Sequence, residues 1–91
     1  MPAPLLSADL LGSIAGFLTT AAFVPQVVKT LRSRSTRDIS LTMFASFTVG
    51  VALWLIYGAM IDSLPVIAAN AVTLVMAGTI LAVKLANFRR E

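Results

Sequence analysis

The chain has 91 residues, of which 58% are hydrophobic and only 12% charged, too few polar residues to cover a soluble globule. It contains no cysteine, which excludes disulfides and thiolate chemistry. The net charge of +3 comes from basic residues at the ends of apolar runs, without the interleaved aromatic residues of a nucleic-acid surface. The composition therefore predicts an all-α integral membrane protein that binds no nucleic acid.

Three long apolar stretches predict three transmembrane helices at about residues 8–30, 39–61 and 64–84, in one domain that covers residues 1–91. At ~1.5 Å of rise per residue, each stretch is long enough to cross a hydrocarbon core of ~30 Å. A side chain that can accept a hydrogen bond from a backbone N–H of the first helical turn lies at the start of each stretch. The predicted N-caps are Ser7, then Ser40 or Asp38, and then Ser63.

The first predicted span contains a proline and an amide, Pro25 and Gln26, inside an apolar run that ends at Lys29. Proline cannot donate a backbone N–H, so the carbonyl of Ala21 loses its partner and the helix bends or loosens there. Gln26 carries two donors that could serve this carbonyl or a facing helix. Pro25 is therefore either a hinge or a static kink of the kind common in membrane helices.

Two glycines at the start of the first span, Gly12 and Gly16, form a GxxxG pair. Such a pair lets a second helix approach closely, and it is equally typical of general helix packing.

The basic residues predict how the chain crosses the membrane. All seven lie between Lys29 and Arg37, at and after the end of the first span, or between Lys84 and Arg90, at and after the end of the third. Since cytoplasmic segments are enriched in Lys and Arg, we expect the N-terminus outside and the C-terminus in the cytoplasm of a multi-pass cell-membrane protein.

The second and third spans carry three informative side chains, Trp54, Tyr57 and Asn70. Trp54 lies eight residues before Asp62 and Asn70 eight after it, so a tight hairpin places both roughly 8 to 12 Å below the outer surface. An amide that faces lipid without a partner is costly, so Asn70 should face either a helix or a wet pocket. Trp54 lies deep for an interfacial belt residue, whereas Tyr57 fits such a belt better.

Taken together, four segments resemble the SemiSWEET sugar transporters, the single-repeat bacterial relatives of the SWEET and PQ-loop proteins. The resemblance covers roughly residues 10 to 85. The segments are Pro25-Gln26, Asp38-Ile39-Ser40-Leu41 with Phe44 behind it, Trp54-Leu55-Ile56-Tyr57-Gly58, and Leu64-Pro65-Val66-Ile67-Ala68-Ala69-Asn70.

The resemblance implies a bundle in which the third span packs between the first two, and a parallel homodimer of two bundles around a central sugar path. It implies that Trp54 and Asn70 bind sugar and that Pro25, next to Gln26, is the hinge. It also implies that Tyr57 helps to close an outer gate and Phe44 an inner one. Asp62 is a further outer-gate candidate, although its turn carries no basic partner.

The chemistry of these residues suits a sugar, because an indole matches apolar C–H faces and an amide matches hydroxyls. The prediction is facilitative uniport of a mono- or disaccharide, of the glucose or sucrose class, by alternating access. The chain would be no enzyme and would need no cofactor or metal. Two alternatives stay open: a PQ-loop-type carrier of another small solute such as an amino acid, and a non-transporting membrane subunit.

Overall fold

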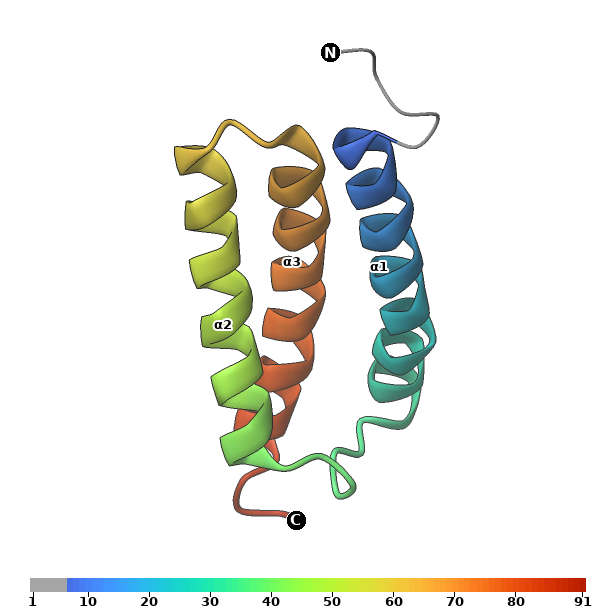
Figure 1. The fold of residues 1–91 in the computed structure, drawn as a ribbon. Helices are drawn as coiled ribbons and strands as arrows, with labels where there is room; N and C mark the ends of the chain where they lie inside the picture. The colour runs from blue at the N-terminus through green and yellow to red at the C-terminus, as the bar shows by residue number, and fades with distance from the viewer. Residues whose placement is uncertain (1–6) are drawn as a thin grey trace.

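The computed structural model describes residues 7–91, which form three helices joined by two short connections (Figure 1). The helices are α1 (Ala8–Ser33), α2 (Leu41–Met60) and α3 (Leu64–Ala86), and the described part of the chain contains no strand. Each helix is long and apolar enough to cross a membrane. The prediction of an all-helical bundle with three membrane-spanning helices is confirmed.

Helix α3 packs between α1 and α2 and contacts both along their length (Figure 1). Small residues allow these close approaches. A Cβ atom built on Gly16 of α1 would lie 2.8 Å from Cβ of Ala69, and one built on Gly58 of α2 would lie 2.7 Å from Cγ1 of Val66. Gly16, from the predicted GxxxG pair, is therefore part of the α1–α3 packing within one protomer.

Serine side chains cap the first two helices as predicted. Oγ of Ser7 accepts the N–H of Leu10 at 3.1 Å, and Oγ of Ser40 accepts that of Met43 at 3.2 Å. The N-cap of α2 is thus Ser40 and not Asp38. Ser63 occupies the N-cap position of α3 without a side-chain hydrogen bond, and a proline lies in the first helical turn.

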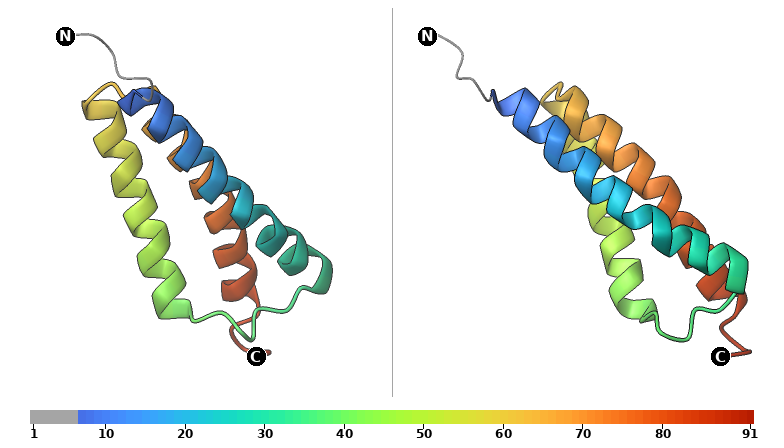
Figure 2. Two further views of the ribbon diagram at one scale, coloured as in Figure 1. Left: turned by 45° about the vertical axis from the view of Figure 1, so that its right-hand side comes forward. Right: turned by 90° about the vertical axis from the view of Figure 1, so that its right-hand side faces the viewer.

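The two ends of the bundle differ, and we name them by their charges. The acidic end holds the α2–α3 turn with Asp62 and the start of α1 with Asp9. The basic end holds the α1–α2 loop, residues 34–40, and the tail after α3, residues 87–91. Helices α1 and α2 lie on either side of α3 (Figure 1), and they are spread further apart at the basic end than at the acidic end (Figure 2).

Most large apolar side chains of the bundle point outward. The buried hydrophobic core of the described residues is small, consisting of Val51, Ala77, Ile80 and Val83. Outward apolar residues are expected of a bundle that lies in hydrocarbon, because lipid tails solvate them as well as a core would. The polar and hollowed parts of the surface are therefore the places to look for a functional site.

Candidate functional site

A cleft with a volume of about 290 Å³ opens between α1 and α2, with α3 as its floor. Two glycines, a threonine and a phenylalanine of α1 form one wall, aromatic and apolar side chains of α2 form the other, and the first half of α3 closes the base. Its lining residues are Gly12, Gly16, Thr19, Phe23, Phe47, Val51, Trp54, Pro65, Val66, Ala69, Asn70 and Thr73. Both residues expected to bind sugar, Trp54 and Asn70, line this one cleft.

The aromatic wall of the cleft is formed by α2. The Trp54 and Tyr57 rings meet edge to face, with their centroids 5.4 Å apart at an interplanar angle of 86°. Such pairs are favourable beyond the area that they bury, so each ring helps to fix the other. Trp54 remains 57% exposed and also borders a second hollow, shared with Tyr57, on the outer side of α2.

The polar floor of the cleft is formed by α3. The Asn70 side chain is half-buried, and its Nδ2 donates a hydrogen bond to the carbonyl of Val66 at 2.9 Å, within the same helix. Within residues 7–91 the amide thus has no partner on another helix, so the hydrogen bond between helices that the sequence left open does not form. An amide offers two donors and two acceptor positions, so most of its capacity remains for a ligand.

Three phenylalanines close the cleft on the side of the basic end. Phe23 of α1 stacks on Phe47 of α2 with centroids 5.6 Å apart, and Phe44 lies 5.9 Å from Phe23 and 5.8 Å from Phe47. Only Phe44 was expected to help form a gate. Phe23 and Phe47 are the two that line the cleft, and sequence reasoning missed them although Phe23 lies two residues before Pro25.

Helix α1 continues through Pro25 without a break and ends eight residues later, at Ser33. Both Pro25 and Gln26 are exposed, on the part of α1 between the phenylalanine cluster and the basic end. Among the described residues the Gln26 side chain makes no hydrogen bond, so it does not serve the carbonyl that Pro25 leaves free. The proline thus lies in the half of α1 that leads to the basic end.

The outer-gate candidates lie at the acidic end. Asp62 adopts a left-handed conformation with φ of 55° and forms the tight α2–α3 turn, in which its N–H bonds to the carbonyl of Ala59 at 3.3 Å. Within residues 7–91 Asp62 has no ion pair. Asp62 and Tyr57 therefore share the acidic end of α2, but no charge pair closes it in one protomer.

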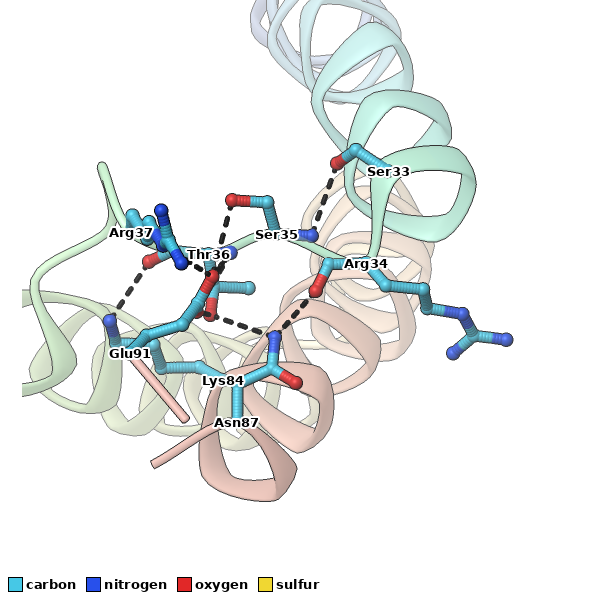
Figure 3. Close-up of polar contacts among 8 residues, drawn as sticks. All are labelled: Ser33, Arg34, Ser35, Thr36, Arg37, Lys84, Asn87 and Glu91. Atoms are coloured by element: carbon cyan, nitrogen blue, oxygen red, sulfur yellow. Dashed lines mark hydrogen bonds and ion pairs between the residues drawn. The ribbon is translucent and has the colours of Figure 1, made fainter. Parts of the chain in front are cut away.

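A second group of polar residues gathers at the basic end, where the α1–α2 loop meets the tail (Figure 3). Thr36 is 1% exposed, and its backbone N–H and hydroxyl both donate to the Glu91 carboxylate. Nζ of Lys84 donates to the Thr36 carbonyl at 2.8 Å, and Nδ2 of Asn87 donates to the Arg34 carbonyl at 2.6 Å. These bonds tie the loop to the end of α3.

The Glu91 carboxylate is the acceptor at the centre of this group. Its side chain is 9% exposed, and Nε of Arg37 lies 3.7 Å from one of its oxygens. Hydrogen bonds from the Thr36 hydroxyl, the Thr36 N–H, and the Ser35 and Asn87 side chains hold its pKa below the ordinary value of 4.5, although desolvation opposes them. The loop had been expected only as a polar connection, and no periodic pattern in the sequence indicated this contact.

Comparisons with known proteins agree with this arrangement of three helices around a cleft. A sequence model of the PQ loop repeat matches residues 8–67. Two relatives named "Sugar transporter SemiSWEET" come from Bradyrhizobium diazoefficiens and Escherichia coli. The first is 53% identical over 84% of this chain and 88% of its own length, and the second is 44% identical over 90% and 92%.

Two solved structures share the fold. One, described as SemiSWEET in the inward-open conformation, matches with a TM-score of 0.84 at 44% identity, over 90% of this chain and 88% of that one. Another, described as a bacterial homologue of SWEET transporters, has a TM-score of 0.78 at 41% identity, over 86% and 94% of the two chains.

The fold and the cleft define a multi-pass protein of the cell membrane, built as one three-helix repeat. This chain belongs to the PQ-loop family and, within it, to the SemiSWEET group. The relatives are named as transporters, which agrees with the prediction that the chain is not an enzyme.

Proposed function

We propose that this protein is a sugar uniporter, which carries a mono- or disaccharide of the glucose or sucrose class across the cell membrane. The observation that carries the proposal is that Trp54 and Asn70 line the same cleft. The proposal is also supported by relatives of similar length, which are named sugar transporters. The comparisons give the broad class, and the residue roles below are our inference.

The cleft offers both kinds of contact that a sugar needs. The exposed indole of Trp54 is a flat apolar surface for the C–H face of a pyranose. The free carbonyl oxygen and second N–H of Asn70 can pair with ring hydroxyls, and Thr73 adds a hydroxyl one turn further along α3. Trp54 and Asn70 are therefore the proposed binding residues.

The functional unit in this proposal is a parallel homodimer. One cleft of about 290 Å³ lies at the small end of the range for ligand pockets, ~300–1,000 Å³, and is open on one side. A second copy facing it across a two-fold axis along the membrane normal would enclose about twice that volume. The sugar would then lie between two Trp54 and two Asn70 side chains.

Alternating access requires one gate on each side of this binding layer. We assign the inner gate to Phe44 with Phe23 and Phe47, because these rings bridge α1 and α2 below the cleft. We assign the outer gate to Tyr57 and Asp62 at the acidic end. Movement of the basic half of α1 about Pro25, with Gln26 beside it, would open the inner side and leave the binding layer in place.

The orientation in this proposal has the acidic end outside and the basic end in the cytoplasm, because all seven basic residues lie in the basic end or in the last turns of α1 and α3 that lead to it. A reporter that is active only in the cytoplasm, fused after Glu91, tests it. A silent reporter in cells that express the protein well would overturn the orientation.

Transport should be uncoupled from ions. Proton-coupled carriers use an ionisable side chain inside the membrane, and the four acidic residues of this chain all lie at helix ends, in loops or in the tail, without any histidine. Proteoliposomes with equal sugar on both sides should exchange it without net accumulation when a proton or sodium gradient is imposed. Uphill accumulation would refute uniport.

The deciding experiment is uptake by the purified protein alone in liposomes, with labelled glucose, sucrose and an amino acid in parallel. Equilibration of a sugar but not of the amino acid supports the proposal. Uptake of the amino acid alone would favour a carrier of another solute. No uptake of any solute, with correctly inserted dimer, would favour a non-transporting subunit. Cross-linking in native membranes tests the dimer, and transport by a protein that cross-links only as monomer would overturn it.

A further inference from the structure

A groove of about 470 Å³ at the basic end lies outside the proposed sugar path. Its wall is the last two turns of α3, and its rim carries two arginines, Arg34 from the α1–α2 loop and Arg90 from the tail. The apolar part of the wall consists of Ala82, Val83 and Ala86. The groove therefore combines two cations with an apolar surface at the point where the apolar run of α3 gives way to charged residues.

One buried residue, Asn87, contacts the backbones of both arginines, Arg34 through its side chain and Arg90 through its own carbonyl. Arg34 has a left-handed backbone with φ of 57°, its N–H bonds to the Thr30 carbonyl at 2.8 Å, and its own carbonyl accepts Nδ2 of Asn87 at 2.6 Å. The Arg90 N–H donates to the Asn87 carbonyl, also at 2.8 Å. Asn87 is 9% exposed, so the backbones that carry the two guanidinium groups are fixed before any ligand binds.

The neighbouring charges leave this groove positive. The Glu91 carboxylate, which lies at the same end of the bundle, is engaged by Thr36, Ser35 and Arg37. Figure 3 shows the Arg34 side chain directed away from Glu91. Within residues 7–91 neither Arg34 nor Arg90 forms an ion pair. An anion in the groove would therefore meet two unpaired guanidinium groups.

We propose that this groove binds an anionic phospholipid, with the phosphate between Arg34 and Arg90 and the start of an acyl chain on Ala82, Val83 and Ala86. Guanidinium groups pair well with phosphate, and basic pockets beside transmembrane helices suit acidic headgroups. A free phosphate would use the arginines but not the apolar wall. The wall is what favours a lipid over a soluble anion.

The site also has a mechanical consequence. Arg34 follows α1 directly and Arg90 follows α3, so a headgroup held by both would tie the basic end of α1 to that of α3. A bound lipid should therefore stabilise the folded bundle against heat, because it binds the native arrangement and not the unfolded chain.

The test is thermal unfolding of the detergent-solubilised protein with increasing phosphatidylglycerol, phosphatidylcholine or inorganic phosphate. We expect phosphatidylglycerol to raise Tm and the other two to leave it unchanged. In the Arg34→Gln/Arg90→Gln variant the lipid concentration for the half-maximal shift should rise at least about tenfold. The matched control is Arg32→Gln/Arg89→Gln, which removes the same charge from neighbouring positions outside the groove and should respond like the wild type.

Three results would overturn the proposal. An equal loss of response in both double variants would mean general attraction to acidic lipid. An equal Tm shift with inorganic phosphate would mean an anion site without a lipid. An unchanged response in the Arg34→Gln/Arg90→Gln variant would mean that the groove is not involved. If that variant does not fold, Arg90→Gln alone, compared with Arg89→Gln by native mass spectrometry of lipid adducts, gives the same decision.

Discussion

Two asparagines, Asn70 in α3 and Asn87 directly after its last residue, show how differently the two ends of this part of the chain use the same side chain. Asn70 is half-buried in the cleft and makes one hydrogen bond, to a carbonyl of its own helix. Asn87 is 9% exposed and its Nδ2 bonds to two groups on the α1–α2 loop, the Arg34 carbonyl and the Thr36 hydroxyl. The amide with one hydrogen bond lies where we place a ligand, and the amide whose Nδ2 bonds to two groups lies where the loop is held to the end of α3.

The difference between the two amides indicates that contacts to other segments of the chain distinguish a structural surface from a binding surface. A polar group in a membrane protein that is left partly unpaired is costly unless water or a ligand completes it. Substitutions at the cleft should therefore affect transport, and substitutions at the basic end should affect stability.

The largest effect is expected at the cleft. Trp54→Ala and Asn70→Ala should each lower sugar uptake at least about tenfold, since each removes a contact twice per dimer and every 1.4 kcal/mol of lost binding is about tenfold. Dimerisation and thermal stability should change little, because both side chains have few partners inside the protomer. Uptake into proteoliposomes is the measurement.

The matched control for Asn70 is Thr79, whose hydroxyl also bonds to a carbonyl of its own helix, that of Val75, at 2.8 Å. Thr79 does not line the cleft, so Thr79→Ala should transport like the wild type. Normal uptake by both cleft variants would mean that the partly unpaired amide is not a binding group, and the division between the two ends would fail.

The junction of the two regions is Pro25, which lies between the phenylalanine cluster and the basic end. Pro25→Ala restores the missing backbone N–H and should stiffen α1 there. We expect uptake to slow several-fold, with sugar affinity nearly unchanged, since the cleft itself is untouched. Sugar binding by calorimetry and uptake by the same preparation separate these effects. Unchanged uptake would make Pro25 a static kink.

At the basic end, Thr36→Val removes the hydroxyl that donates to Glu91 and accepts from Asn87 while keeping the shape of the side chain. Because it leaves buried partners unpaired, the free energy of unfolding should fall by about 1–3 kcal/mol. Thr36→Ser keeps the hydroxyl and should lose much less. Denaturation in detergent measures both, and equal losses would mean that methyl packing, not hydrogen bonding, holds the loop.

How far the sequence predicts this molecule depends on whether a feature is local. Apolar runs and serine caps predict the helices, because each of these signals lies within one short segment of the sequence. Trp54 and Asn70 could be paired because their equal spacing from Asp62 sets their depth in a hairpin. Phe23 could not be paired with Phe44 and Phe47, because neither segment alone shows which face of α1 points toward α2.

The hydrogen-bonded group at the basic end was also beyond sequence reasoning, for a different reason. Thr36 and Glu91 lie 55 residues apart, and both belong to segments without periodic pattern. Short polar residues after a helix are typical of a loop, which is where Thr36 lies. Its burial arises only because the tail folds back over the loop, and that depends on the length and direction of α3.

The smallest expected effect concerns the charge of Glu91. Its pKa in the folded protein is below the ordinary 4.5, mainly because the Thr36 hydroxyl donates to the carboxylate. A carboxyl group with a lowered pKa binds fewer protons in the folded state than in the unfolded state, so its stabilising contribution is complete above the ordinary pKa. That contribution is lost as the pH falls through the lowered value.

The difference in Tm between the wild type and Glu91→Gln should therefore be constant from about pH 8 to about pH 5 and shrink below that. Asp9→Asn, at the acidic end, is the control for general charge effects and should not reproduce this profile. A difference that instead changes between pH 6 and 8 would mean that another group controls the contact between loop and tail, and the basic end would then not be held by the Glu91 carboxylate.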